Sequence, residues 1–343
     1  MQHIANTLYV MTQGAYLHLD HDTVRVEVER ATQLRVPLLQ LGGVVTFGNV
    51  LLSPALLAHC AEDGRAVTLL DRNGRFKARV VGPTGGNVLL RRAQHAALSD
   101  PARTLAIARH VVAGKIQNER QVLARGAREA GDPADAAALG AAARALAEGI
   151  AATQWCGDLD ALRGVEGTAA RAYFGAFDRL VRDDREAFRM LGRNRRPPLD
   201  RTNALLSFCY TLQLADCVAA LEGVGLDPQV GYLHVLRPGR PALGLDLLEE
   251  LRAPVADRLA LTLLNRRQLL RDDFEARPGG AVSLTDAGRK RVVVAYQERK
   301  EDEVPHRVLD RKIPLGLVPH IQARLLARHL RGDLDYYPPF LIR

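Results

Sequence analysis

Alternating apolar and polar residues over roughly the first 80 positions predict β-strands. Runs such as TLYVMT (7–12), AYLHLD (15–20) and TVRVEVE (23–29) follow a period of two, with Gly and Asp between them. A helix-like segment, SPALLAHCAEDG (53–64), precedes two more such runs, at 66–71 and 75–82. We therefore predict a small, mostly antiparallel β domain over residues 1–85.

The hydrophobic period changes to about 3.6 beyond this region. In residues 102–130, ARTLAIARHVVAGKIQNERQVLARGAREA, apolar side chains recur at i, i+3, i+4 and i+7 with charges between them. Alanine-rich stretches (136–152, 168–177 and 204–221) and a basic segment (318–331) continue the pattern. Gly-Pro and Gly-Gly pairs around 82–86 mark the boundary. The sequence predicts an α+β protein whose residues 86–343 form an essentially all-helical domain.

Two segments interrupt the helical pattern. GRNRRPPLDR (192–201) places four arginines beside a Pro-Pro pair, so it cannot be helical throughout, and we expect an exposed loop. The tail DYYPPFLIR (335–343) is more apolar than a solvated terminus usually is. We expect it to dock either on a protein partner or on the body of the chain itself.

Composition narrows the class of protein. Of 343 residues, 47% are hydrophobic and 25% are charged, which is typical of a globular chain. The first residues carry no basic head followed by an apolar stretch, and Gln, Gly, Asn, Ser and Pro break the most apolar region. The four cysteines form no C-x-x-C pair, so neither a zinc ribbon nor a disulfide framework is supported. We expect a soluble cytoplasmic protein with no membrane span.

The charge is unevenly placed. The formal net charge is +8, and residues 1–85 contain eight basic and seven acidic side chains, so nearly all of the excess lies in the helical part. A basic surface attracts phosphate backbones, because condensed counterions are released on binding. A nucleic-acid partner is one interpretation, and a merely solvated basic surface is the other.

The segment GYLHVLRPGRPALGLDLLEE (231–250) carries three ionisable groups of interest among apolar residues. Asp246 and Glu249 are three apart, which places both on one face of a helix, although the same spacing also fits helix N-terminal capping. His234 lies twelve residues before Asp246, across the turn RPGRP. That turn could fold His234 back beside the acidic helix, but a lone histidine is often only a satisfied core or surface group.

A third acid, Glu166, lies between Gly164 and Gly167 in RGVEGTAARAYF, at the expected head of an apolar helix. A glutamate in a first helical turn is favoured by the helix dipole, and this is the structural alternative. The glycines would also let a bulky polyanion approach the backbone closely.

Together, two carboxylates and one imidazole make an oxygen-rich ligand set suited to Mn²⁺ or Mg²⁺. Such an ion stabilises the charge that develops in phosphoryl transfer. The chain has no G-x-x-x-x-G-K-[ST] loop, which argues against chemistry driven by nucleotide hydrolysis. It also has no G-x-S-x-G elbow and no Cys/His pair that would offer a protein nucleophile.

Four motifs in order carry a resemblance to a known family: LRGVEGTAARAYF, LDRTNALLSFCYTLQLADC, GYLHVLRPGRPALGLDLLEELRAPVADR and LTDAGRKRVVVAYQER. With ANTLYVMTQGAYLHLD near the start, the chain resembles the CRISPR-associated endonuclease and integrase of spacer acquisition over nearly its whole length. The motif wording and the tail look most similar to the subtype I-C branch.

The resemblance implies an N-terminal β-sandwich-like domain that forms a homodimer and a helical domain that holds a divalent metal. It implies that Glu166, His234 and Glu249 are metal ligands and catalytic residues, with Asp246 as an auxiliary group. It further implies a small ferredoxin-like adaptation partner protein and double-stranded DNA substrates. In the implied reaction, the 3′-hydroxyl of a prespacer attacks a phosphodiester at a CRISPR repeat, which accounts for the missing protein nucleophile.

Several other residues fit either a functional or a structural role. Asn203 and Tyr210 lie in a matched motif but could be polar groups of helix packing. Six arginines are candidate phosphate contacts or merely solvated charges: Arg193, Arg195, Arg196, Arg237, Arg240 and Arg252. The alternative function is a non-catalytic DNA-binding scaffold in which the acids only cap helices.

Overall fold

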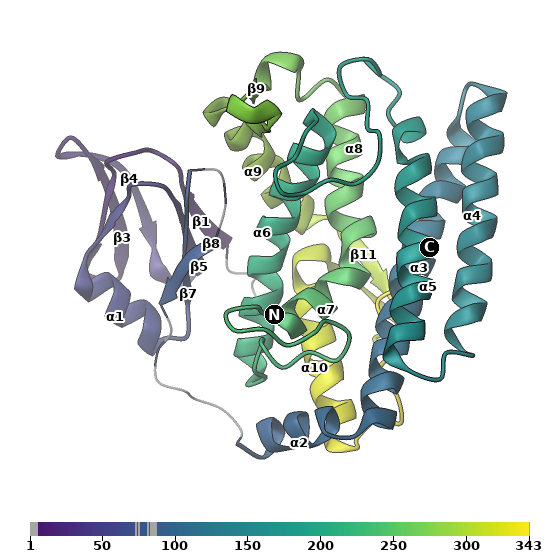
Figure 1. Cartoon of the computed structure of the whole chain (residues 1–343). Helices are drawn as coiled ribbons and strands as arrows, with labels where there is room; N and C mark the ends of the chain where they lie inside the picture. Colours follow the sequence, from purple (N-terminus) through teal and green to yellow (C-terminus); the bar gives the residue numbers. More distant parts are fainter. Residues whose placement is uncertain (1–5, 73, 75, 81, 83–87, 343) are drawn as a thin grey trace. The chain divides into compact units, whose positions relative to one another are not determined.

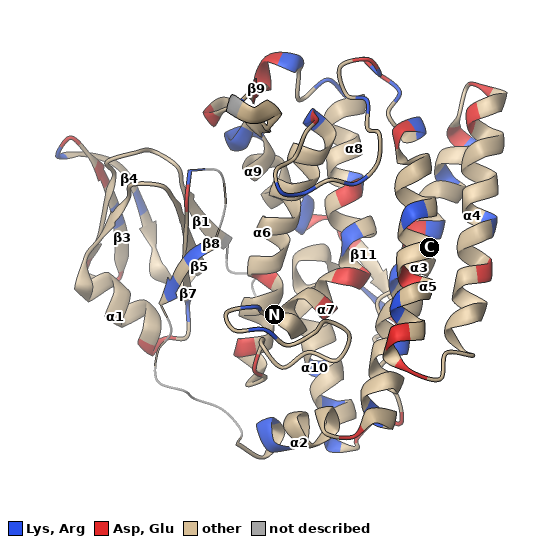
Figure 2. Ribbon diagram, in the orientation of Figure 1, with Lys and Arg blue, Asp and Glu red and all other residues tan. Residues whose placement is uncertain are grey.

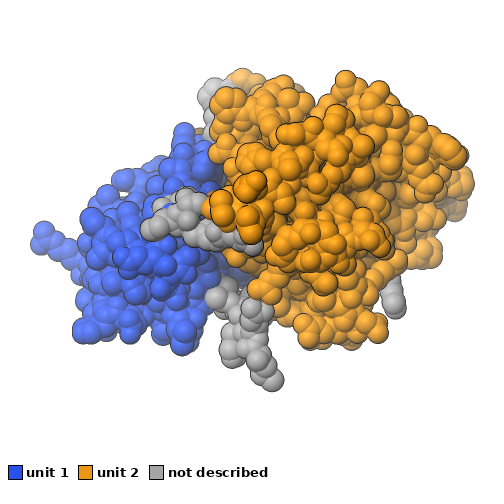
Figure 3. All heavy atoms as spheres, turned by 90° about the horizontal axis from the view of Figure 1, so that it is seen from below, with its two compact units in different colours: residues 1–86, 289–297 blue, residues 87–288, 298–343 orange. Residues whose placement is uncertain are grey.

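The computed structural model describes residues 6–72, 74, 76–80, 82 and 88–342. The chain divides into two compact units, one of residues 1–86 with 289–297 and one of residues 87–288 with 298–343 (Figure 3). Strands dominate the first unit and helices the second, which confirms the predicted α+β class. The predicted boundary between residues 85 and 86 lies outside the described residues.

The first unit contains two four-stranded sheets (Figure 1). One has the order β1 (Asn6–Val10), β5 (Leu41–Phe47), β7 (Ala66–Leu70) and β8 (Phe76–Val80). The other has the order β4 (Ala31–Pro37), β3 (Thr23–Val28), β2 (Tyr16–Asp20) and β6 (Leu51–Leu52). Buried residues of both sheets and of helix α1 (Pro54–Glu62) form one core, which includes Leu17, Val24, Val44 and Leu56.

The expectation of a mostly antiparallel domain was only partly right, because three of the six strand pairs among the described residues of this unit are parallel. β1 and β7 both run parallel to β5, and β6 runs parallel to β2. The antiparallel pairs are β2 with β3, β3 with β4, and β7 with β8. Alternating hydrophobicity reports which face of a strand is buried but not the direction of its neighbour, and the chain crosses over through β6 and α1 between β5 and β7.

The second unit is built from helices. They are α2 (Val88–Leu98), α3 (Pro101–Glu129), α4 (Pro133–Thr153), α5 (Leu159–Phe177), α6 (Arg201–Val224), α7 (Ala242–Leu251), α8 (Arg258–Asn265) and α10 (Val318–Arg331). The ends of α9 (Asp286–Glu301) also belong to this unit, whereas its residues 289–297 belong to the first. Two short hairpins accompany the helices: β9 (Phe274–Ala276) with β10 (Val282–Leu284), and β11 (Glu303–His306) with β12 (Arg311–Pro314). Figure 2 shows charged residues of both signs along these helices.

Local signals define the long helices. Asp100 caps α3 by accepting hydrogen bonds from the amides of Ala102 and Arg103, and Pro101 occupies its first turn. Asp200 caps α6, which ends at Gly225 in a left-handed conformation. α6 is long and apolar enough to cross a membrane by composition, but two thirds of its most apolar stretch is buried inside the structure, as in a core helix of a globular protein.

α3 packs against α4, α5 and α7, and α6 packs against α7 and α10. In Figure 1, α3, α4 and α5 lie side by side. A six-residue π-helix (Arg252–Asp257) joins α7 to α8. Widened turns of this kind are rare and often occur at functional sites. Side chains from α3, α5, α7 and this turn meet inside the helical unit.

The tail docks on its own unit, which is the second of the two expected modes. Tyr337 and Phe340 are buried, and the Tyr337 hydroxyl donates a hydrogen bond to Glu250 on α7. Asn118 on α3 donates to the carbonyls of both Glu250 (2.7 Å) and Phe340 (2.8 Å). We call residues 336–342 the strap, because they tie α3 to α7.

Candidate metal and catalytic site

Asp246 anchors the segment that carries His234. Its Oδ2 accepts hydrogen bonds from the amides of Tyr232 (2.6 Å) and Leu233 (3.1 Å), and its Oδ1 accepts one from the amide of His234 (3.0 Å). The imidazole Nδ1 of His234 lies 2.7 Å from the same Oδ1. With these partners the carboxylate is saturated, and it holds the ring in one orientation.

The glycine at 231 makes this approach possible. A Cβ atom there would lie 2.6 Å from the carbonyl carbon of Ala242 and 2.8 Å from Oδ2 of Asp246. No side chain fits, because the colliding atoms belong to the start of α7 and to the anchoring carboxylate. From α5, Arg163 donates two hydrogen bonds, of 3.0 and 2.8 Å, to the carbonyl of Leu233. The segment 231–234 is thereby held between α5 and α7.

His234 and Glu249 face one another. Nε2 of the imidazole lies 3.6 Å from Oε1 of Glu249, and Arg252 pairs with the same oxygen at 3.0 Å. The other oxygen, Oε2, pairs with the Lys115 ammonium at 2.9 Å. Burial disfavours the charged form of Glu249, but Arg252, Lys115 and His234 outweigh it and lower its pKa to about 2.

Glu166 lies on the other side of Lys115 and pairs with the same ammonium. Glu166 and His234 retain 26% and 19% of their side-chain exposure, whereas Glu249 and Lys115 retain 4% each. The site thus has one open side and one buried side. A Cβ at Gly164 would meet nothing within 4 Å, so the surface of α5 beside Glu166 is bare.

The capping alternatives are wrong for both acidic segments. α7 begins at Ala242, so Asp246 and Glu249 lie beyond its first turn and bond across the fold instead. α5 begins at Leu159 with Asp158 as its cap, so Glu166 lies in the helix interior and not at its head. The two glycines around Glu166 resembled a helix start, but both are accommodated within the helix.

Lys115 and Glu119 were missed by the sequence reasoning. They lie one turn apart on α3, with exposures of only 3% and 1%. Burial alone would lower the pKa of Lys115, but the charges of Glu249, Glu119 and Glu166 raise it. Burial raises the pKa of Glu119 to about 8, against the opposing charge of Lys115. The signal was present in the sequence, because both residues fall on the apolar face of a helical pattern, where isolated charges are costly.

A second buried cluster lies next to the first. Asp257, at the end of the π-helix, accepts hydrogen bonds from the hydroxyls of Tyr173 (2.8 Å) and Tyr210 (2.5 Å). The guanidinium groups of Arg193 and Arg252 lie 5.3 and 4.9 Å from the centre of the Tyr210 ring. Tyr210 therefore connects the loop at 193 to the arginine that pairs with Glu249.

The six candidate arginines occupy two environments. Arg195, Arg196 and Arg237 are exposed and Arg240 is half-buried. The positive charges of Arg237, Arg196 and Arg195 contribute, after burial, to lowering the pKa of Arg240, so the two loops are close. We call these four residues the arginine surface.

Arg193 and Arg252 do not face solvent, as phosphate contacts or solvated charges would, but bond inside the helical unit. Arg193 donates to Asn203 Oδ1 (2.6 Å) and to the Ser207 hydroxyl (3.1 Å), and Arg252 is bound to Glu249. Asn203 itself is fully buried and also donates to the carbonyl of Gly192 and to Asp200. These contacts hold the loop 192–200 against α6, as expected of polar groups used in packing.

The residues fit a divalent cation by their donor set. Two carboxylates and an imidazole with a fixed partner on its other nitrogen are typical ligands of Mn²⁺ or Mg²⁺. Within the described ranges, no three His, Cys, Asp or Glu side chains are already gathered closely enough to hold a metal. The ammonium of Lys115 lies between Glu166 and Glu249.

Comparison with known proteins gives the family. Residues 8–298 match the family described as "CRISPR associated protein Cas1". The chain is 60% identical over 343 residues to a CRISPR-associated endonuclease Cas1 of Moorella thermoacetica, covering 100% of both chains. It is 48% identical to one of Chlorobaculum tepidum, covering 98% of each. The chain therefore belongs to the Cas1 family of CRISPR-associated endonucleases, and the resemblance found in its motifs is confirmed.

Solved structures agree in fold. A Cas1 protein from Thermotoga maritima superposes with a TM-score of 0.82 at 25% identity, over 95% of this chain and 97% of that one. A casposase bound to its integration product gives a TM-score of 0.82 at 21% identity, over 97% and 93%. A chain of a Cas6-RT-Cas1–Cas2 complex superposes with a TM-score of 0.82 at 22% identity, and the match covers 99% of this chain and 36% of that longer chain.

Proposed function

We propose that this protein is a cytoplasmic, metal-dependent DNA endonuclease and integrase of CRISPR adaptation, which joins the 3′-hydroxyl ends of prespacers to phosphodiesters of the CRISPR repeat. The observation that carries the proposal is that Glu166 and Glu249 pair with one buried ammonium while His234 faces Glu249, close to the arginine surface. Family membership supports the class of reaction.

The three side chains would hold the metal, Mn²⁺ or Mg²⁺, through carboxylate oxygens and Nε2 of His234. When bound, the ion supplies Lewis-acid stabilisation of the phosphoryl-transfer transition state. Asp246 keeps the proton on Nδ1 of His234, which leaves Nε2 as the free nitrogen. Arg252 balances the charge of Glu249 from the buried side.

DNA would approach from the open side. Glu166 and His234 are the exposed members of the site, and the bare surface at Gly164 leaves room for a sugar-phosphate backbone. The arginine surface would bind phosphates and set the position of the strand. The attacking group comes from the DNA end, and no bond to the protein is formed.

The proposed partners follow the same reasoning. The β-rich unit would form the homodimer, and a small ferredoxin-like adaptation protein would join two such dimers. The Cas1–Cas2 assemblies among the related folds support the second point.

Strand transfer of a labelled duplex into a repeat-containing plasmid tests the function. Glu166→Gln, His234→Gln and Glu249→Gln should each lower product formation by at least about 10²-fold, the scale for loss of a strong transition-state contact. Glu148→Gln, at an exposed position on α4, is the matched control. A duplex with dideoxy 3′ ends should give no joined product. EDTA should abolish activity, and Mn²⁺ or Mg²⁺ should restore it.

Near-normal strand transfer by the Glu166 and His234 variants, with DNA binding intact, would favour the alternative of a non-catalytic DNA-binding scaffold.

A further inference from the structure

A buried lysine occupies the position between the two carboxylates of the site. The ammonium of Lys115 pairs with Glu166 and lies 2.9 Å from Oε2 of Glu249. Its side chain is 4% exposed, so water solvates the ammonium poorly. At this depth the ammonium is not placed to contact a substrate at the surface. A structural ion pair between helices would be the simple explanation, but these are the same carboxylates that would hold the metal.

A second buried acid, Glu119, lies one turn from Lys115 on α3, and one of its carboxylate oxygens accepts no hydrogen bond from the described residues. Residues four apart lie on the same face of a helix. A buried acceptor without a hydrogen bond costs free energy of folding. The unpaired Oε2 of Glu119, one turn from a buried ammonium, therefore needs an explanation.

Charge repulsion supplies that explanation. A divalent cation held by Glu166 and Glu249 would lie within a few ångströms of the ammonium, and like charges repel strongly at a poorly solvated position. Lysine has a flexible four-carbon stem and a compact charge, so it can change partner without a change of fold. Glu119 offers an acceptor one turn away that lies on the same helix.

We propose that Lys115 is a positioning residue that holds Glu166 and Glu249 together when no divalent cation is bound, and that it transfers to Glu119 when the cation enters. The inference rests on the proposed metal site and concerns residues outside its ligand set. The ammonium stands in for the metal's charge, and it adds to the compensation that Arg252 gives the buried carboxylate of Glu249. Glu119 is the group that receives the displaced charge.

Metal affinity measured on the full-length protein tests the exchange without any DNA reaction. Mn²⁺ binding is followed by isothermal titration calorimetry for wild type, Lys115→Gln, Glu119→Gln and the double variant. Lys312→Gln, which removes an exposed lysine, is the control for overall charge. Glu249→Gln identifies the site that the titration reports.

Because Lys115 competes with the cation, Lys115→Gln should bind Mn²⁺ at least about tenfold more tightly. Glu119→Gln should bind it about tenfold more weakly, because Lys115 then has no other partner. In the Lys115→Gln background, Glu119→Gln should have less than about a threefold effect, since the two residues act through one another. A merely structural ion pair predicts the opposite sign for Lys115→Gln.

Thermal unfolding gives a second readout. Lys115→Gln should melt at a lower temperature than wild type in EDTA, and adding Mn²⁺ should raise its melting temperature by more than that of wild type. If this variant fails to fold without metal, refolding with Mn²⁺ present and recovery of a wild-type melting temperature would support the exchange equally well. Failure to fold in both conditions, with Glu119→Gln showing wild-type Mn²⁺ affinity, would overturn it.

The outcomes separate the two hypotheses. Equal Mn²⁺ affinity in wild type and Glu249→Gln would defeat the metal site, and the proposed function with it. If Glu249→Gln loses Mn²⁺ binding but Lys115→Gln binds Mn²⁺ more weakly than wild type, only the Lys115 exchange is defeated. The same holds if the Lys115 and Glu119 variants have the Mn²⁺ affinity of the control Lys312→Gln.

Discussion

His234 and Asp246 form a tight side-chain pair, with Nδ1 of the imidazole 2.7 Å from Oδ1 of the carboxylate. The same carboxylate accepts hydrogen bonds from the amides of residues 232–234, so one acid fixes both the backbone and the ring of the proposed ligand. The twelve-residue separation in sequence is closed by the turn 235–240. This relationship assigns Asp246 to orienting His234 and leaves Glu249 as the acid that faces Nε2.

Replacing Asp246 should therefore damage both stability and activity. Asp246→Asn presents an amide group to backbone donors and should lower the free energy of unfolding by about 1–3 kcal/mol, the cost of leaving a buried polar group unsatisfied. Strand transfer should fall by about 10- to 100-fold, the usual effect of removing the partner of a metal-binding histidine. Chemical denaturation and the plasmid assay measure the two effects. Wild-type behaviour in both would mean that the pair does not orient His234.

The strap should contribute to stability through Tyr337. Its hydroxyl donates to the buried Glu250, and Gln322 donates to the same hydroxyl at 3.0 Å. Tyr337→Phe removes one partner of a buried network and should cost about 1–2 kcal/mol of unfolding free energy. Tyr336→Phe, at a neighbouring exposed tyrosine, should change stability by less than about 0.5 kcal/mol. Equal melting temperatures for the two variants would show that the strap is not held by this contact.

The sequence could predict the parts of the fold that depend on periodicity. The basic segment 318–331 is a helix with the same bounds, because its apolar stripe is regular and Gly332 ends it in a left-handed conformation. The direction of neighbouring strands could not be predicted, since pairing is set by crossovers far away in sequence. The start of α5 was misplaced because glycine is unfavourable inside helices, so Gly164 and Gly167 resembled a helix boundary.

The candidate site was predictable as far as residue chemistry reaches. Glu166, His234 and Glu249 are unusual polar groups in apolar surroundings. In the structure Glu166 and Glu249 both pair with Lys115, and His234 faces Glu249. Lys115 and Glu119 were not singled out, because a lysine and a glutamate four apart usually form a solvated pair. Their position on the apolar face of α3 was the available signal, and the packing of α3 against α5 and α7 buries the pair.

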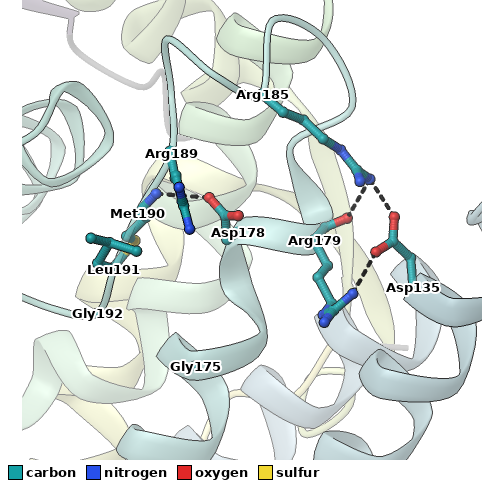
Figure 4. Close-up of a pocket in the computed structure, with 9 residues that line it drawn as sticks. All are labelled: Asp135, Gly175, Asp178, Arg179, Arg185, Arg189, Met190, Leu191 and Gly192. Carbon is teal, nitrogen blue, oxygen red and sulfur yellow. Dashed lines mark hydrogen bonds and ion pairs between the residues drawn. The ribbon is translucent and has the colours of Figure 1, made fainter.

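Asp135 should make the free energy of unfolding depend on pH in the acid range. It lies beside a cavity of about 400 Å³ and accepts hydrogen bonds from Arg185 (2.5 Å) and Arg179 (2.8 Å) (Figure 4). The hydrogen bond from Arg185, followed by that from Arg179, lowers the pKa of Asp135 below its ordinary value of 3.8. A carboxyl group whose pKa is lowered by folding stabilises the protein above its unfolded-state pKa, and this contribution disappears as pH falls through the folded-state pKa.

The prediction is that Asp135→Asn destabilises the protein by about 1 kcal/mol at pH 7. The difference from wild type should begin to shrink as pH falls below about 4, near the unfolded-state pKa, and it should disappear as pH falls through the lower folded-state pKa of Asp135. Thermal denaturation from pH 7 to pH 3 measures it. Asp160→Asn, at an exposed side chain of α5, should show no comparable trend. A difference that stays constant with pH would mean that charge at Asp135 is not the cause.

The loop 192–200 contains two kinds of arginine. Arg195 and Arg196 are exposed and lie near Arg237 and Arg240, so they are placed to bind DNA phosphates. Arg193 is instead bound to Asn203 and stacks on Tyr210, which makes it part of the packing of the loop. The two kinds should therefore respond differently to replacement, although they are neighbours in sequence.

Arg195→Ala combined with Arg196→Ala should weaken DNA binding, and the slope of log affinity against log salt concentration should become shallower by about 0.9 for each phosphate that the protein no longer neutralises. Arg193→Ala should leave this slope nearly unchanged and lower the melting temperature, because it removes hydrogen bonds to Asn203 and Ser207 and a cation–π interaction. Fluorescence anisotropy with a labelled duplex at several salt concentrations, beside thermal denaturation, separates the two effects. If the double variant keeps the wild-type slope, the exposed arginines are only solvated. If Arg193→Ala flattens the slope as strongly as the double variant does, its inward hydrogen bonds do not persist in solution.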